Sequence, residues 1–370
     1  MYRTTISPTN RLFQSLVAPW PPKHRQAHPA GHCAEMATAV PAHLLKRPIV
    51  CPAVKPSMSP TLSQRLRRRW FSLLCLVALL VGLPVSCAVL EHQERQLVFR
   101  IEPGTAGWYR GLPSTVQELE LTPQSFKAGQ NIHAWWWPAT RADAPAILYL
   151  HGVRWNLTGQ LFRIEQLHAL GYSVLAIDYR GFGQSHGDLP SESSVYQDAR
   201  IAWERLKLLQ PDANKRLIYG HSLGGAVAID LAAELGRTAA AGKTPIAARG
   251  LIVESTFTTL ADAAQAVTKT SLPVRWVLSQ KFDSVDKIRD IGMPLLVVHG
   301  LKDDYVPPRL SQELFKVALE PKKLLLVPGG THNNSMSLAG KDYAQAIHAL
   351  LRAKPGHNLA GPTAATVPTG

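Results

Sequence analysis

Cysteine is scarce in this chain, and none occurs after residue 90. The 370 residues contain four cysteines, which all lie in the first quarter of the sequence: Cys33, Cys51, Cys75 and Cys87. A domain formed by residues 91–370 therefore has neither a disulfide framework nor a cysteine-ligated metal site. Acidic residues are just as scarce at the front, where residues 1–90 contain only Glu35 against eleven lysines and arginines.

This imbalance accounts for most of the formal net charge of +14. A charge of that size is typical of proteins that bind nucleic acid or anionic membranes. Residues 91–370, however, hold 29 basic and 25 acidic residues, a balance that is ordinary for a soluble domain. The charge distribution therefore argues against nucleic-acid binding and assigns the basicity to the front of the chain.

The first 57 residues show no sustained period of either a helix or a strand. They are rich in Pro, Ala, His and Arg, so they cannot bury enough apolar area to offset the entropy of ordering. We predict that residues 1–57 are disordered. Met58 directly precedes a segment typical of a true N-terminus, so residues 1–57 need not be translated at all.

Residues 58–90 have the layout of an export signal or a membrane anchor. Four arginines between residues 65 and 69 precede an uncharged stretch of 21 residues, 70–90, and a basic segment before an apolar one is typical of a secretory signal. About 20 apolar residues also suffice to span a bilayer. The sequence Leu83-Pro-Val-Ser-Cys87 resembles a bacterial lipoprotein cleavage box, although Pro84 stands where such boxes usually carry Leu.

Three interpretations of residues 58–90 follow: a lipoprotein signal with Cys87 as the lipidated residue, an uncleaved anchor, or an ordinary cleaved signal. All three predict a membrane-associated or exported protein, located in the bacterial cell envelope if Cys87 is lipidated. The N-terminal segment would then be the part that contacts the membrane.

From residue 91 to 353, apolar runs of strand length alternate with amphipathic stretches of helix length, and the tail 354–370 is predicted to be flexible. This alternation predicts an α/β fold with a mainly parallel sheet covered on both faces. No helical pattern separates the first two strands, which predicts an antiparallel start. The expected strands are 116–122, 132–137, 146–150, 173–178, 217–220, 250–253, 294–299 and 323–327, and the expected helices are 161–170, 194–209, 223–235, 258–267, 309–318 and 342–351.

The most informative motif is Gly220-His-Ser222-Leu-Gly224, which lies between an apolar strand and a helix. A serine hydroxyl is a poor nucleophile unless it is exposed, aligned and deprotonated by a base. A sharp strand-to-helix turn would expose Ser222, and glycines would be needed on both sides because side chains would clash across the turn. The helix N-terminus would favour developing negative charge. We predict that Ser222 is a catalytic nucleophile.

An acid and a base follow the serine in the order that this architecture requires. Asp303 and Asp304 come after the strand at 294–299, and the spacing does not separate them. His332 comes after the last strand, at the same edge of the sheet as Ser222. We predict that His332 is the general base and later the general acid.

Two backbone amides are expected to bind the oxyanion. One belongs to Leu223, the residue after the nucleophile, and the other to the loop after the third strand. That loop reads His151-Gly152-Val153, and the His-Gly pair allows close backbone approach. We therefore predict that Val153 supplies the second donor.

Together these stretches resemble the alpha/beta-hydrolase superfamily, in particular its serine-aminopeptidase-like, monoacylglycerol-lipase-like and alpha/beta-hydrolase-domain branch. The resemblance covers about residues 110–352 and rests on His151-Gly152, Asp178-Tyr-Arg-Gly-Phe-Gly-Gln-Ser185, Gly220-His-Ser-Leu-Gly-Gly225, His299-Gly-Leu-Lys-Asp303-Asp-Tyr-Val-Pro307 and the turn before His332. It implies an alpha/beta-hydrolase fold with a mostly parallel eight-stranded sheet, helices on both faces and a small lid near 272–282. It also implies that the acid is Asp303.

The resulting hypothesis is a serine hydrolase that cleaves esters, including lipid or acyl esters, through an acyl-enzyme and without a metal or cofactor. A peptidase or a thioesterase could use the same residues. A catalytically silent binding protein is the alternative outside enzymes, and the complete triad in the sequence argues against it. Fold-level analogy does not identify the substrate.

Overall fold

The computed structural model describes residues 62–243, 246–269 and 274–353. Its centre is one eight-stranded sheet with the strand order β1-β2-β4-β3-β5-β6-β7-β8. The predictions for residues 1–57, for Met58 as a start and for the tail 354–370 fall outside the described residues. The described residues from Arg67 onward form one compact unit, which contains the whole sheet.

The strands are short and the helices that follow them are longer, as the alternating pattern predicts. The strands are β1 (Gln117–Leu121), β2 (Ile132–Trp137), β3 (Ala146–Leu150), β4 (Ser173–Ile177), β5 (Arg216–His221), β6 (Gly250–Glu254), β7 (Leu295–Gly300) and β8 (Lys322–Val327). The α-helices are α1 (Leu62–Phe99), α2 (Leu157–Ala169), α3 (Glu192–Leu209), α4 (Leu223–Ala240), α5 (Leu260–Thr268), α6 (Ser284–Lys287), α7 (Pro308–Val317) and α8 (Ser335–Arg352). Short 3₁₀ turns are η2 (Ala213–Lys215), η3 (Val274–Trp276) and η4 (Ile288–Asp290).

All eight predicted strands are present, and the predicted antiparallel start is confirmed. β2 pairs antiparallel with β1 and with β4, whereas the five remaining pairs, from β4-β3 to β7-β8, are parallel. Strands β2 to β7 are buried along their whole length, which is why they read as continuous apolar runs rather than alternating ones. The parallel strands bring their carboxyl ends to one edge of the sheet, where ligands bind in open α/β folds.

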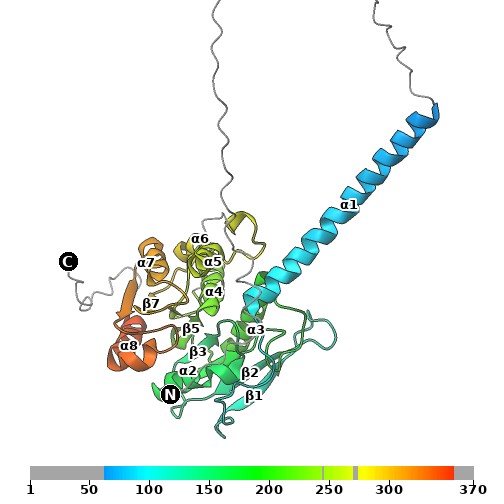
Figure 1. Cartoon of the computed structure of the whole chain (residues 1–370). Helices are drawn as coiled ribbons and strands as arrows, with labels where there is room; N and C mark the ends of the chain where they lie inside the picture. Colours follow the sequence, from blue (N-terminus) through cyan, green and yellow to red (C-terminus); the bar gives the residue numbers. More distant parts are fainter. Residues whose placement is uncertain (1–61, 244–245, 270–273, 354–370) are drawn as a thin grey trace, which may run out of the picture. The chain divides into compact units, whose positions relative to one another are not determined.

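Helices cover both faces of the sheet, as predicted (Figure 1). Apolar residues of α3, α4 and α7 pack on one face and those of α2 and α8 on the other. The three consecutive tryptophans of β2 are divided between the two faces, with Trp136 in the first core and Trp135 and Trp137 in the second. Since all three are buried, they contribute to the core and not to an exposed aromatic surface.

Helix α1 runs without interruption from the predicted signal or anchor segment into the folded domain. It continues past residue 90 and ends at Phe99, whose buried ring packs edge-on against Phe182 and Phe282, with ring centroids 6.4 and 6.3 Å away. The predicted boundary between residues 90 and 91 therefore falls inside a helix. Among the described residues, no helix is both long enough and apolar enough to span a membrane.

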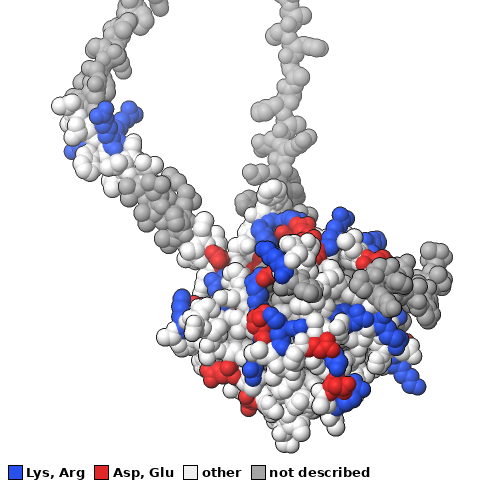
Figure 2. All heavy atoms as spheres, turned by 180° about the vertical axis from the view of Figure 1, so that it is seen from behind, with Lys and Arg blue, Asp and Glu red and all other residues white. Residues whose placement is uncertain are grey.

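Charged residues are distributed on the structure as the sequence indicates, with both signs on the domain and basic residues at the start of α1. Figure 2 shows basic and acidic side chains interspersed over the displayed face of the domain. The first described turns of α1 carry arginines and no acidic residue.

Between β6 and β7 the described residues form α5, η3, α6 and η4, and residues 272 and 273 of the small lid expected near 272–282 lie outside the described part of the chain. Glu94 of α1 accepts hydrogen bonds from the Ser279 and Gln280 amides, at 2.8 Å each. Trp276 and Val277 of this segment are 88% and 82% exposed. The segment is therefore tied to α1 by its polar backbone groups and presents apolar side chains to the outside.

Candidate active site

Ser222 lies in the sharp turn between β5 and α4, in a conformation that non-glycine residues rarely adopt. Its backbone has φ 55° and ψ −122°, and such strain persists only where the surroundings hold it. The Ser222 amide donates to the Glu254 carbonyl at 2.9 Å, and its carbonyl accepts from the Gly225 amide and the Thr256 hydroxyl. The turn is therefore held by both the neighbouring strand and the helix.

The two glycines of the motif are required sterically, as predicted. A Cβ atom at Gly220 would lie 2.2 Å from the Gly224 carbonyl oxygen, and one at Gly224 would lie 2.1 Å from that of Leu150. Both separations are far below contact distance. Larger residues at either position would push the helix away from the turn and from the end of β3.

Asp303 and His332 are brought together at the same edge of the sheet. The Nδ1 atom of His332, on the loop after β8, lies 2.8 Å from Oδ2 of Asp303, on the loop after β7. Asp303 is buried, whereas Asp304 is exposed. The structure thus separates two residues that spacing alone leaves equivalent, and only Asp303 contacts the histidine.

The Asp303 carboxylate is fully satisfied by hydrogen bonds. Its Oδ1 accepts from the Tyr305 and Val306 amides at 2.9 Å each, and its Oδ2 also lies 3.2 Å from Nε2 of His299. Burial alone would raise the pKa of this carboxyl, but the hydrogen bonds from His299 and His332 hold it well below its usual range. Asp303 therefore remains ionised at neutral pH.

Of the two predicted oxyanion donors, Leu223 directly follows the serine, and Val153 belongs to a loop that approaches the serine turn at Gly152. Leu223 is the first residue of α4. Gly152 is so close to the turn that a Cβ atom there would be 3.0 Å from the Ser222 Cβ atom, and Val153 follows it in the same loop. Nδ1 of His151 lies 2.6 Å from the Gly152 carbonyl oxygen, so it fixes the peptide unit that contains the Val153 N–H.

Within the described residues no hydrogen bond joins the side chains of Ser222 and His332, but His332 contacts the residue before the serine. The imidazole rings of His332 and of His221, the residue before the nucleophile, have centroids 4.9 Å apart. Catalytic hydrogen bonds in unliganded enzymes are often long and tighten only when substrate binds.

Two histidines that are not among the predicted site residues contact the predicted site. His221 is one of them, because its Nε2 atom lies 2.8 Å from the His332 carbonyl oxygen. His299 is the other, and its Nε2 atom lies 2.8 Å from the Val306 carbonyl oxygen and 3.2 Å from Oδ2 of Asp303. Their places at strand ends were visible in the sequence, whereas their partners were not.

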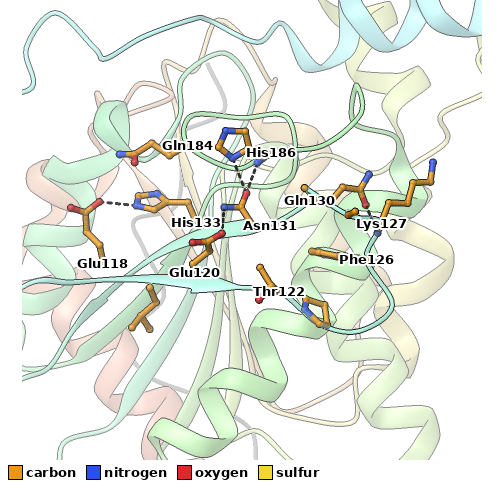
Figure 3. A pocket seen from close by; sticks show the side chains of 14 residues that line it. Glu118, Glu120, Thr122, Phe126, Lys127, Gln130, Asn131, His133, Gln184 and His186 are labelled. Carbon is orange, nitrogen blue, oxygen red and sulfur yellow. Dashed lines mark hydrogen bonds and ion pairs between the residues drawn. The ribbon is translucent and has the colours of Figure 1, made fainter.

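A groove that none of these residues lines is shown in Figure 3. It has a volume of about 830 Å³ and is lined by side chains of β1, β2 and the loops beside them. Glu118 bonds His133 there at 2.7 Å, and Asn131 bonds Glu120 at 2.7 Å. None of Ser222, Asp303 and His332 lines it. Its polar groups are largely paired with one another, and it lacks the predicted catalytic residues. We therefore do not assign the reaction to this groove.

Comparison with known proteins places these features in context. The family model described as "Serine aminopeptidase, S33" matches residues 142–287, which include Ser222 and end before Asp303 and His332. The uncharacterized protein Rv2307c of Mycobacterium tuberculosis (strain ATCC 25618 / H37Rv) is 37% identical over 282 residues, which cover 74% of this chain and 94% of that protein.

Two further similarities bear on the family. The lysophosphatidylserine lipase ABHD12 of Xenopus tropicalis is 32% identical over 206 residues, 51% of each chain. The crystal structure of an alpha-beta hydrolase from Vibrio vulnificus superposes with a TM-score of 0.55 at 21% identity, covering 71% of this chain and 93% of that one. At this identity the structural likeness concerns the fold.

Proposed function

This chain belongs to the alpha/beta-hydrolase superfamily, and we propose that it is a serine hydrolase that cleaves carboxylic esters through Ser222, His332 and Asp303. The observation that carries the proposal is the strained Ser222 at the start of α4, beside a loop whose histidine is hydrogen-bonded to a buried carboxylate. This is the arrangement that an activated serine requires.

In the proposed reaction, the Ser222 hydroxyl attacks the ester carbonyl while His332 takes its proton. Asp303 orients the imidazole and stabilises the imidazolium, and the amides of Leu223 and Val153 bind the oxyanion. His332 then gives the proton to the leaving alcohol, and water cleaves the acyl-enzyme. Each oxyanion donor is expected to contribute about 3 kcal/mol of transition-state stabilisation.

We favour lipid or acyl esters as the substrate class. One relative is named a lysophosphatidylserine lipase, and the segment between β6 and β7 exposes Trp276 and Val277. A series of p-nitrophenyl esters with acyl chains of two to sixteen carbons tests this preference, and we expect kcat/KM to rise with chain length. A maximum at the acetyl ester would contradict it.

The proposal itself is tested by comparing wild-type protein with Ser222→Ala. We expect ester hydrolysis to fall by about 10⁴-fold or more, because the remaining groups cannot form an acyl-enzyme. Circular dichroism and the thermal midpoint of the variant should match those of the wild type. Hydrolysis that survives the substitution would contradict the proposal.

A peptidase is the second candidate, because the matching family model is described as a serine aminopeptidase. A thioesterase would use the same groups. Parallel assays with p-nitrophenyl esters, acyl thioesters and aminoacyl amides distinguish the three activities, and we expect the ester to be turned over fastest. A catalytically silent binding protein would turn over none of them.

We also propose that the protein is membrane-associated or exported through its N-terminal segment. Cys87 is an exposed free cysteine, so its thiol is accessible to modification. Mass spectrometry of the mature N-terminus tests this proposal. A diacylglyceryl-modified Cys87 is expected for a lipoprotein of the bacterial cell envelope, whereas a chain that continues unmodified through residues 58–90 would be an uncleaved anchor.

A further inference from the structure

The loop that carries His332 is held by its backbone as well as by Asp303. Two consecutive carbonyls of this loop accept hydrogen bonds from buried side chains of other elements. Nε2 of His221, at the end of β5, bonds the His332 carbonyl at 2.8 Å, and Nη2 of Arg163, in α2, bonds the Asn333 carbonyl at 3.2 Å. These bonds link parts of the chain 111 and 170 residues apart.

Arg163 is an unusual residue to find in this place, because its side chain is 1% exposed. Its charge is balanced by Glu254, at the end of β6, whose Oε1 lies 3.3 Å from Nη2 and which is fully buried. Burial alone would lower the pKa of the guanidinium, but the Glu254 carboxylate raises it. Arg163 therefore stays charged, and its N–H groups remain available as hydrogen-bond donors to the Asn333 carbonyl.

The carboxylate that holds Arg163 is itself fixed in place. Its other oxygen accepts hydrogen bonds from the hydroxyls of Tyr219, in β5, and Tyr343, in α8, the latter at 2.6 Å. Burying an ion pair is costly, and replacement by apolar residues is often neutral or stabilising. The Arg163–Glu254 pair contacts the His332 loop through the Asn333 carbonyl. We therefore explain this pair by its orientation of the loop and not by a contribution to stability.

His221 acts on the same loop in one tautomer only. Burial, followed by the positive charge of Arg163, lowers the pKa of His221 well below its usual value. The ring is thus neutral at physiological pH. Because a carbonyl can only accept, Nε2 must carry the proton that bonds His332.

We propose that Arg163 and His221 are positioning residues that fix the two carbonyls of the His332 loop, so that the imidazole between Asp303 and Ser222 is held ready for proton transfer. The inference rests on the proposed function, because it assigns His332 the role of general base. It adds Glu254 as the group that holds Arg163. None of the three touches the reacting atoms in this account.

The test compares Arg163→Met, which removes the donor, with Arg163→Lys, which can still donate to the Asn333 carbonyl. Active sites are counted by fluorophosphonate labelling, and kcat and KM for a p-nitrophenyl ester are measured per labelled site. Because a misplacement of about 1 Å can cost about 100-fold, we expect kcat of Arg163→Met to fall by about that factor with KM within about twofold of wild type. Arg163→Lys should recover most of the loss.

Asp198→Asn is the matched control, because Asp198 forms another buried pair, with Arg180 at 2.7 Å, that does not contact the His332 loop. It should lower the thermal midpoint without lowering kcat per labelled site. If Arg163→Met does not fold, the same comparison can be made at the His332 carbonyl. There His221→Leu removes the donor, whereas His221→Asn keeps an N–H group that can donate.

The two hypotheses fail in distinguishable ways. If kcat per labelled site is unchanged in Arg163→Met, or falls equally in Asp198→Asn, the positioning role is overturned while the serine hydrolase stands. If the wild-type protein neither hydrolyses esters nor takes a label at Ser222, the proposed function fails first.

Discussion

At the scale of single residues, the neighbouring acids Asp303 and Asp304 give the sharpest comparison. Asp303 is buried and bonds His332, whereas Asp304 is exposed one residue further on. Without an ionised acid, the imidazole loses the partner that sets its tautomer and stabilises its charge.

We therefore predict that Asp303→Asn lowers kcat by about 10⁴-fold, and that Asp304→Asn leaves it within about threefold of wild type. Steady-state ester hydrolysis per folded protein measures both. Equal losses in the two variants would show that the charge of the loop matters and not the hydrogen bond to His332.

The residues that we propose to act through their side chains could be predicted from the sequence, and those that we propose to act on the backbone could not. Ser222 lies within a motif and His332 follows the last strand, so local order was enough to select them. Arg163 and His221 bind carbonyls, which every residue possesses. No pattern in the sequence therefore marks the contacts of Arg163 and His221 with the His332 loop, which lies more than 100 residues away.

At the scale of elements, the β1–β2 hairpin carries a charge pair whose stabilising effect should depend on pH. Burial alone would lower the pKa of His133, in β2, but hydrogen bonds and the negative charges of Asp178 and Glu118 raise it above its usual value. A raised folded pKa means that the stabilisation is fully present below the pKa of the unfolded chain, about 6.5. It is lost as pH rises through the folded value.

We predict that His133→Gln lowers the free energy of unfolding more at pH 5.5 than at pH 9, as measured by urea denaturation of both proteins at the two pH values. His168→Gln serves as control, because that ring bonds a backbone carbonyl and stacks on Trp137 without a carboxylate partner among the described contacts. A loss in His133→Gln that is larger at pH 9 would reverse the assigned sign.

Elements in the middle of the sheet were predicted within one or two residues, because strands buried on both faces have a distinctive composition. Helix boundaries were less well predicted. The last helix begins at Ser335 and contains a non-helical glycine, Gly340 with φ 44°, which hides its first turns from a search for helical periodicity. It was therefore expected to begin only at residue 342.

At the scale of the whole molecule, the end of α1 belongs to the folded domain. Phe99 is fully buried, whereas Leu97 of the same helix is 69% exposed. Removing a buried phenylalanine ring typically costs about 3–5 kcal/mol. We predict that Phe99→Ala lowers the free energy of unfolding by about that amount and that Leu97→Ala changes it by less than about 0.5 kcal/mol. Chemical denaturation followed by tryptophan fluorescence measures both free energies. A change of less than about 1 kcal/mol in Phe99→Ala would contradict the claim that the end of α1 is part of the folded domain.

The central claim is that Ser222, held in a strained turn at the edge of the sheet, is the catalytic nucleophile. The most direct measurement is to react the purified full-length protein with a fluorophosphonate and to locate the adduct by peptide mass spectrometry. We predict a single adduct on the peptide that contains Ser222 and none in Ser222→Ala. An adduct on another residue, or labelling that persists in Ser222→Ala, would contradict the account.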